Sequence, residues 1–254
     1  MTSFVADPTA ALSFSLARLK EPRIMNPAWL PRIDAAALAP SSLDAAQQRI
    51  VDRALIAPTV LALSVTTASE RREVTVVVDR EGAITLTPDA EGTYRWEEIE
   101  VAQTAALLEA QLPADTPLAA PPQMTARSES TRLPLSPEQQ QAIAARRESG
   151  VRAQDAIAAQ EDLSPLLRDA LLSDGDRAVL DISLHVPAEG GEAPPLLFHL
   201  LRHWTVGAHG LYAADGDEPI ATAIHRVEGG DVLATMLPLL AEGVQLARGE
   251  AVAA

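Results

Sequence analysis

The sequence predicts an α+β protein built from two copies of one strand-rich unit. Residues 44–112 and residues 164–246 share the same order of elements: a helix, four strands and a second helix. A proline-rich stretch separates these two units, and 47% of the chain is apolar, which is typical of a globular protein. We therefore expect a mostly antiparallel sheet, or two sheets packed edge to edge or face to face, with quasi-twofold symmetry and helices on one side.

The first unit, residues 44–112, begins with a helix that Ser42 or Asp44 can cap and that runs to about Ile56. Pro58 ends this helix because proline cannot donate the next helical hydrogen bond. Four β-rich runs separated by turn residues follow, and a helix closes the unit. The predicted strands are Thr59–Thr67, Glu73–Asp79, Ala83–Thr87 and Gly92–Glu97, and the closing helix is Glu98–Leu112.

The second unit, residues 164–246, repeats this order with other side chains. Its opening helix has a serine followed by a proline, the residues that favour a helix start. The helices are Ser164–Leu172 and Val232–Leu246, and the strands between them are Asp176–Val186, Leu196–Thr205, Leu211–Ala214 and Pro219–Val227.

The segments outside the units look less regular. Residues 1–43 are interrupted by prolines, and a short amphipathic helix is expected only over Thr9–Lys20. Residues 113–163 are expected to form a proline-rich surface linker followed by a helical insert that starts at Ser136. Residues 247–254 are expected to fray.

Charge and composition exclude several kinds of partner. The negative net charge of −15 comes entirely from residues after 60, and such a field repels phosphate backbones and anionic lipids. No apolar run reaches the length of a membrane span, and the N-terminus lacks the basic residues of a secretory signal. With no cysteine, a disulfide framework is impossible. We expect a cytoplasmic protein that binds neither nucleic acid nor membrane.

The residue types of a catalytic site are sparse. His199 and His203 are four residues apart, but the run LLFHLLRHWT that holds them reads as a strand, which separates them by about 13 Å. No nucleophile elbow or glycine-rich phosphate loop is present. We expect no enzyme activity and no catalytic residue, cofactor or metal. A hydrolase that uses His199, His203 or His225 with a carboxylate remains an alternative.

The same run is the best candidate for binding a protein. We expect His199, Arg202 and Trp204 to share one face of the strand and to contact a partner, since tryptophan and arginine are enriched at interaction hot spots. Apolar residues occur on both faces of the run, as in a central strand or an exposed apolar patch.

Four segments of the two units carry a likeness to a known family: LIAPTVLALSV, VTVVVDREGAITLTPDAEGTYRWEEI and VAQTAALLEAQL in the first unit, and LLSDGDRAVLDISL in the second. Through these segments the chain resembles the EspG family of type VII secretion chaperones. The proline-broken N-terminus departs from the family, in which we expect a strand and a helix there. The resemblance implies a duplicated α/β architecture and a cytosolic chaperone that masks an aggregation-prone helical tip of a secreted partner.

We therefore expect a non-enzymatic chaperone or adaptor, monomeric or homodimeric, that binds a helical protein partner. The main alternative is a structural or accessory component of a larger particle, such as a phage-like or injection assembly.

Overall fold

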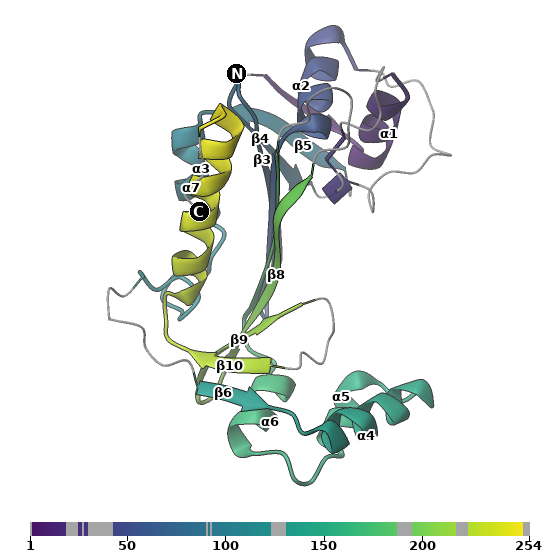
Figure 1. The fold of residues 1–254 in the computed structure, drawn as a ribbon, viewed down its shortest axis with the longest axis vertical. Coiled ribbons are helices and arrows are strands. Elements are labelled where there is room, and N and C mark those ends of the chain that lie inside the picture. The colour runs from purple at the N-terminus through teal and green to yellow at the C-terminus, as the bar shows by residue number, and fades with distance from the viewer. Residues whose placement is uncertain are drawn as a thin grey trace.

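In the computed structural model the chain forms a single ten-stranded sheet with helices against it (Figure 1). The described residues are 2–18, 25–26, 28–29, 43–89, 91, 93–122, 131–186, 195–216 and 223–250. The strands are β1 Ser3–Ala6, β2 Thr59–Thr66, β3 Arg71–Val78, β4 Ala83–Pro88, β5 Tyr94–Ile99, β6 Thr131–Pro134, β7 Arg177–His185, β8 Leu196–Gly207, β9 Gly210–Asp215 and β10 Ala223–Val227. The helices are α1 Pro8–Arg18, α2 Ala45–Ile56, the 3₁₀ turn η3 Val101–Gln103, α3 Thr104–Glu109, α4 Pro137–Glu148, α5 Ala153–Ala158, α6 Pro165–Leu172 and α7 Asp231–Arg248.

The strand order is β1-β5-β4-β3-β2-β7-β8-β9-β10-β6, and every neighbouring pair is antiparallel. The predicted α+β class and antiparallel sheet are thereby confirmed. β2 and β7 meet in the middle, with a register that runs from Thr59 opposite Leu184 to Thr66 opposite Arg177. The strands of both predicted units therefore join edge to edge into one continuous sheet.

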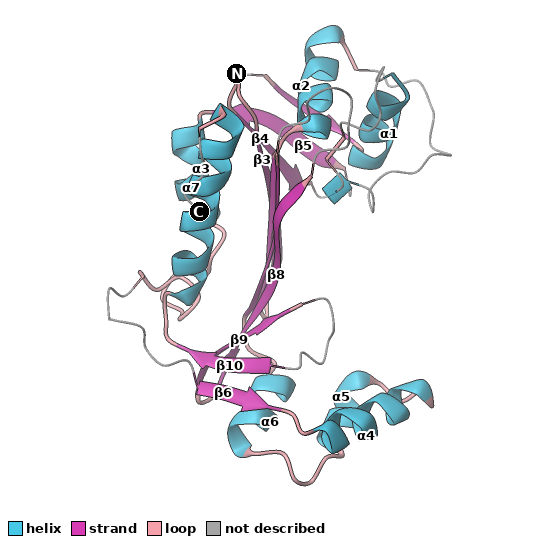
Figure 2. Cartoon of the chain, viewed as in Figure 1, coloured by secondary structure: helices cyan, strands magenta, loops and turns pink. Residues whose placement is uncertain are grey.

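One face of this sheet is covered by α3 and α7. Alternate side chains of the central strands point into the core beneath these helices, among them Leu61 and Leu63 of β2 and Leu180 and Ile182 of β7. Each of these four side chains is fully buried. This core holds α7 along the middle of the sheet, as Figure 2 shows in cyan against magenta.

The opposite face is covered at one end by α1 and α2. Val77 of β3 packs there with Val51 and Leu55 of α2, whereas Val76 and Val78 pack under α3 and α7. The expectation of helices on one side only is therefore wrong. The consecutive valines of β3 explain why helices cover both faces, because a strand that is apolar at successive positions is buried on both sides.

The other end of this second face is covered by α4, α5 and α6. Their core contains Leu133 of β6, Ile143, Ile157 and Tyr212 of β9. Leu118 is also fully buried, against α7 and its neighbours. The expected surface linker is thus wrong in part, because its leucines enter two cores between the prolines.

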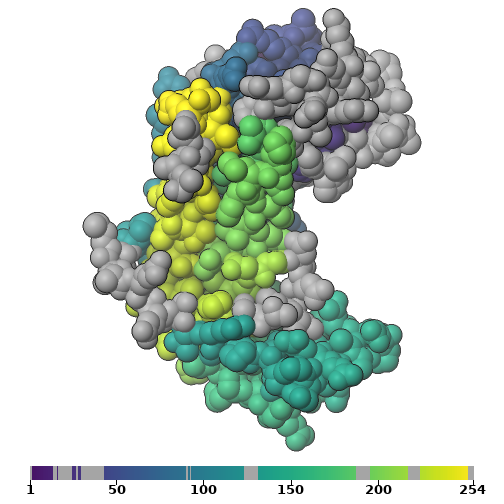
Figure 3. All heavy atoms as spheres, in the orientation of Figure 1, coloured from purple at the N-terminus to yellow at the C-terminus, as the bar shows by residue number. Residues whose placement is uncertain are grey.

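Among the described residues, no helix covers the middle of the second face, between the helices at its two ends (Figure 1). The space-filling view is hollowed at this place, between the end that carries α1 and α2 and the end that carries α4 to α6 (Figure 3). Within the described residues, no helix combines the length and the apolar character that a membrane span needs.

Local signals fixed several boundaries correctly. The Asp44 side chain accepts hydrogen bonds from the backbone N–H groups of Ala46 and Gln47 at 2.9 Å, as a helix cap should. At the N-terminus, α1 confirms the helix expected over Thr9–Lys20, whereas β1, which pairs with β5, was not expected. The strand and the helix that the resemblance implies for this segment are thus present, and the expectation of an irregular N-terminus is wrong in part. Much of the rest of residues 1–43, and the tail from residue 251, lie outside the described residues.

Candidate functional site

β8 is longer than the strand beside it, and this difference creates an open edge. β7 pairs with β8 from Leu196 to Thr205, whereas β9 pairs only with Arg202–Gly207. Beyond that ladder, Gly216 N–H donates to the carbonyl of Leu201 at 2.8 Å. No described strand pairs with Leu196–Leu200 on the β9 side, and we call this stretch the open β8 edge.

Backbone groups of His199 face this open side. In an antiparallel strand the N–H and C=O groups of successive residues point alternately to the two neighbours. Leu201 faces β9 because its carbonyl accepts from Gly216, and Val206 faces β7 because its N–H donates to Asp176 O at 2.9 Å. The same alternation turns His199 toward the missing neighbour and Leu200 toward β7. A register shift opposite Leu184 and His185 interrupts the alternation near Leu197.

Three of the side chains at the open β8 edge are both apolar and exposed. Leu196 is 57% exposed, Leu197 50% and Phe198 37%, and Val186 beside them at the end of β7 is 39% exposed. These four are a majority of the seven large hydrophobic residues that are exposed in the described part of the chain. The space-filling view shows β8 in green, uncovered beside α7 in yellow (Figure 3). Exposed apolar side chains gathered on a strand end are typical of an interaction surface.

Arg202 and Trp204, two of the predicted partner-binding residues, are engaged within the protein. Trp204 is 1% exposed, and its Nε1 donates to Asp231 Oδ2 at 2.8 Å. Arg202 Nη2 donates to the same oxygen at 3.1 Å, and its guanidinium lies 5.5 Å from the centre of the Trp204 ring. Both side chains therefore fasten the first turn of α7 to β8.

His199 lies on the opposite face of β8 from this pair, because it is three positions before Arg202 and successive side chains of a strand alternate between the two faces. Its Nε2 is 3.0 Å from Asp181 Oδ1, and both side chains are about half exposed. The expectation that His199, Arg202 and Trp204 share one face is therefore wrong. A binding role for any of the three stays a prediction, and His199 is the one placed on the open surface.

The histidines of the hydrolase alternative are not gathered. His199 and His203 lie on the same strand, which keeps them about 13 Å apart. His225 is on β10, opposite Ala213 of β9 and Arg132 of β6. In the part of the chain that the structure describes, no three histidine, aspartate or glutamate side chains are placed to hold a metal ion.

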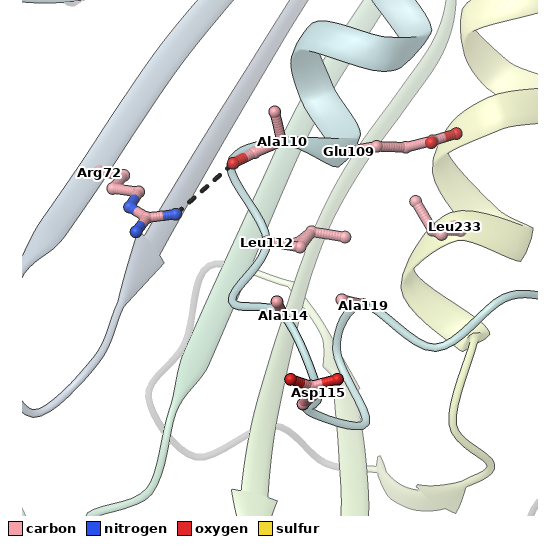
Figure 4. A pocket seen from close by; sticks show the side chains of 8 residues that line it. All are labelled: Arg72, Glu109, Ala110, Leu112, Ala114, Asp115, Ala119 and Leu233. Carbon is pink, nitrogen blue, oxygen red and sulfur yellow. Dashed lines mark hydrogen bonds between the residues drawn. The ribbon is translucent and has the colours of Figure 1, made fainter.

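A pocket of about 550 Å³ lies on the face of the sheet that α3 and α7 cover, between the end of α3 and α7 (Figure 4). Arg72 is the one cation among the described residues that line it, and its Nη1 lies 3.5 Å from the carbonyl oxygen of Ala110. The hydrogen bond from Arg72 to Glu70 raises the pKa of its guanidinium. The lining contains none of the residues that the sequence analysis proposed, and it consists of Arg72, Glu109, Ala110, Leu112, Ala114, Asp115, Ala119 and Leu233.

The sequence predicted the apolar strand that contains the open β8 edge, but not which of its residues are exposed. The run from Leu196 to Leu201 is apolar on both faces, and this pattern suits a buried central strand as well as an exposed patch. The structure divides the run, since Leu200 packs partly against the central core while Leu196–Phe198 are exposed. The signal that identifies the edge is the unequal length of β8 and β9.

Comparison with solved structures finds a match that extends over nearly the whole chain. It is the Mycobacterium tuberculosis type VII secretion system chaperone EspG5, in a structure that also contains the PE25-PPE41 dimer. The match covers 97% of this chain and 95% of that chain, with 13% sequence identity and a TM-score of 0.45. No protein-family model matches the chain. No curated protein matches it either.

EspG5 is a member of the family that the sequence resembles.

Proposed function

We propose that this protein is a non-enzymatic chaperone or adaptor of the cytoplasm that keeps a secreted, helical partner protein soluble. The observation that carries the proposal is the uncovered apolar strand end, in which Val186, Leu196, Leu197 and Phe198 are each more than a third exposed. A protein that is soluble on its own gains nothing from such a patch, because exposed apolar surface promotes association. The patch has a use when a partner covers it.

The position of the patch supports a protein partner rather than a small molecule. It lies on a strand at the surface instead of in a cleft, and small-molecule sites are concave and bury most of the ligand. A folded partner can cover an exposed strand end of this kind, whereas a small molecule bound there would stay largely in solvent.

The architecture supports a further part of the proposal, that the chain is an internal duplication. β1 precedes α1, α2, the strands β2 to β5 and α3, and β6 precedes α4 to α6, the strands β7 to β10 and α7. Each half thus has an edge strand, helices, four strands and a closing helix, and β2 and β7 pair antiparallel between the halves. The proposed units 44–112 and 164–246 would each gain the edge strand before them. EspG5, whose structure holds a protein dimer, offers an analogy for such a scaffold and no more.

Co-purification tests the function. Tagged wild-type protein, Leu197→Asp and Val151→Asp are purified from the cells that produce them, and the recovered partner is quantified. Val151 is the matched control, because it is also an exposed apolar residue, at 38%, but lies beyond α4. We expect one helical partner in a defined stoichiometric complex with the wild type and with Val151→Asp, and at least about a tenfold loss with Leu197→Asp.

Three results would contradict the proposal. Recovery of the partner that Leu197→Asp leaves unchanged would remove the strand end from the function. Sedimentation of the wild type with large particles would favour the structural-component alternative. An activity that disappears when His199, His203 and His225 are substituted would favour the hydrolase.

A further inference from the structure

We propose that the open β8 edge binds its partner by strand addition: an extended, cationic segment of the partner pairs with Leu196–Leu200 and continues the line of β9. This inference deepens the proposed function and depends on it for the existence of a protein partner. It assigns the contact to backbone hydrogen bonds with side chains packed on either face.

The open β8 edge presents backbone hydrogen-bonding groups on the side away from β7. The His199 N–H and C=O point away from β7, and β7 holds the other side of β8 through nine paired positions. An added strand antiparallel to β8 would therefore be collinear with β9 and begin next to Gly216. Its side chains would meet Phe198 and Leu200 on one face of the sheet and His199 on the other.

A second strand of the same sheet shows what a protected edge looks like. β3 also extends beyond the ladder that it forms with β4, because that ladder covers only Thr75–Val78. The exposed start of β3 carries Arg71, Arg72 and Glu73, and charged side chains of this kind prevent unwanted strand pairing. The open β8 edge has no charged residue from Leu196 to Leu201. It therefore lacks the usual protection of an edge that stays unpaired.

Charge decides between the two possible occupants of this edge. A second copy of the chain would bring another net charge of −15 to the same place, and the two fields would repel each other. Asp181 on β7 and Asp215 at the end of β9 are both more than half exposed on either side of the edge. A segment with Lys or Arg near its first residues would lie beside Asp215. The fitting occupant is thus an extended segment that alternates apolar residues and carries basic residues at its N-terminal side.

Removal of a single backbone donor tests this mode of binding. His199→Pro deletes the N–H that faces the open side, whereas His199→Val removes the same imidazole and keeps the N–H. A third variant, Leu197→Lys, places a charge on the edge at an exposed position and serves if His199→Pro fails to fold. Circular dichroism and thermal unfolding establish which variants are folded.

The probe is a displayed library of random peptides of about ten residues, a length that suits one strand. Peptides selected on the wild-type protein are synthesised and titrated against each variant by fluorescence anisotropy. We expect enriched peptides that alternate apolar residues after a basic start. We expect His199→Pro or Leu197→Lys to weaken them by about tenfold or more, and His199→Val by less than about threefold. Affinity should fall several-fold when NaCl is raised from about 50 to about 500 mM.

Each other outcome overturns the inference. Enriched peptides that follow a helical pattern, or that bind His199→Pro as tightly as the wild type, exclude strand addition. Self-association of the wild type that salt strengthens and His199→Pro abolishes identifies a second copy as the occupant. If the cellular partner binds and is insensitive to His199→Pro, the proposed function stands and only the mode of binding fails.

Discussion

Asp231 accepts a hydrogen bond from the indole Nε1 of Trp204 at 2.8 Å, so the first residue of α7 is tied to β8. The same carboxylate oxygen accepts from Arg202 Nη2 at 3.1 Å. A carboxylate in the first turn of a helix also interacts favourably with the positive end of the helix dipole. One side chain thereby positions the longest helix of the molecule on the sheet.

Asp231→Ala is expected to destabilise the protein by about 1–3 kcal/mol, because it leaves the buried Trp204 donor without its acceptor and removes one of the two carboxylates that pair with Arg202. Urea unfolding followed by tryptophan fluorescence measures the change. Asp231→Asn keeps an oxygen acceptor for Trp204 and is expected to lose less. Equal stability of the alanine variant and the wild type would show that this contact contributes nothing to the docking of α7.

The ion pair between Arg53 of α2 and Asp79 connects this helix to the hairpin of β3 and β4. Arg53 Nε and Nη2 donate to the two carboxylate oxygens at 2.7 and 2.9 Å, and both side chains are almost buried. The hydrogen bond to Asp79 raises the pKa of Arg53 against the opposing effect of burial. Arg53→Met is expected to cost about 3–5 kcal/mol because it leaves Asp79 unpaired.

Arg49 on the same helix provides the control for Arg53. It pairs with Glu81, but its side chain is 68% exposed, and exposed pairs contribute about 0–1 kcal/mol. Arg49→Met should therefore change the free energy of unfolding by less than about 1 kcal/mol. A similar loss for both variants would mean that burial does not distinguish the two pairs.

Tyr212 gives the protein a pH dependence at alkaline pH. Burial raises the pKa of its hydroxyl to about 12, and its hydrogen bond to Asp169 Oδ2 at 2.8 Å acts in the same direction. A group whose pKa is raised by folding stabilises the protein below its ordinary pKa of about 10, and this stability is lost as the pH rises toward 12. The difference in unfolding free energy between wild type and Tyr212→Phe should therefore be constant up to about pH 10 and shrink above it.

The chain has only two tyrosines, so the absorbance change that disappears in Tyr212→Phe reports this residue directly. A midpoint near 10 for that change would contradict the prediction.

At the acid end, burial by itself would raise the pKa of Asp169, but hydrogen bonds from His209 N–H, the Tyr212 hydroxyl and Ala208 N–H lower it. The stability from Asp169 is therefore present above its ordinary pKa of about 4 and is lost below it.

Gly243 lets α7 approach the central strand β2 closely. A Cβ at this position would lie 2.6 Å from Thr59 Cγ2, and Thr59 Oγ1 donates to the Gly243 carbonyl at 3.0 Å. Alanine is favoured over glycine within a helix by about 1 kcal/mol, but overpacking here costs about 1–3 kcal/mol. We expect Gly243→Ala to lower the free energy of unfolding.

The double variant Gly243→Ala with Thr59→Ser identifies the cause, because serine lacks the methyl group that would clash and keeps the hydroxyl. It should recover part of the stability that Gly243→Ala loses, as measured by urea unfolding. Failure of the second change to recover any stability would place the strain elsewhere, for example at Leu184.

Local sequence patterns were sufficient for the helix caps and for the central strands. Asp44 caps α2, Ser136 caps α4 and Ser164 caps α6, each by a side-chain oxygen that accepts a backbone N–H. The aliphatic runs from Thr59 and Arg177 became the paired central strands. These features depend on neighbours within a few residues, so one sequence contains the information for them.

Contacts between distant residues were beyond the same reasoning. β1 is four residues long, and it is a strand because it pairs with β5, about ninety residues away. Glu98 and Ile99 were expected in a helix but belong to β5, which pairs with β4. The pattern of the run around Trp204 left burial and exposure open, because both suit an apolar strand.

The sequence by itself determined the α+β class, the order of most strands and helices, and the acidic character of the chain, because propensity, capping and charge are properties of short segments. Only the tertiary structure decided that Trp204 is buried against Asp231 while Phe198, on the same strand, is exposed. The physical reason is that exposure depends on which strand ends beside which. β9 pairs with β8 only from Arg202 to Gly207, so the five residues of β8 from Leu196 to Leu200 extend past the end of β9.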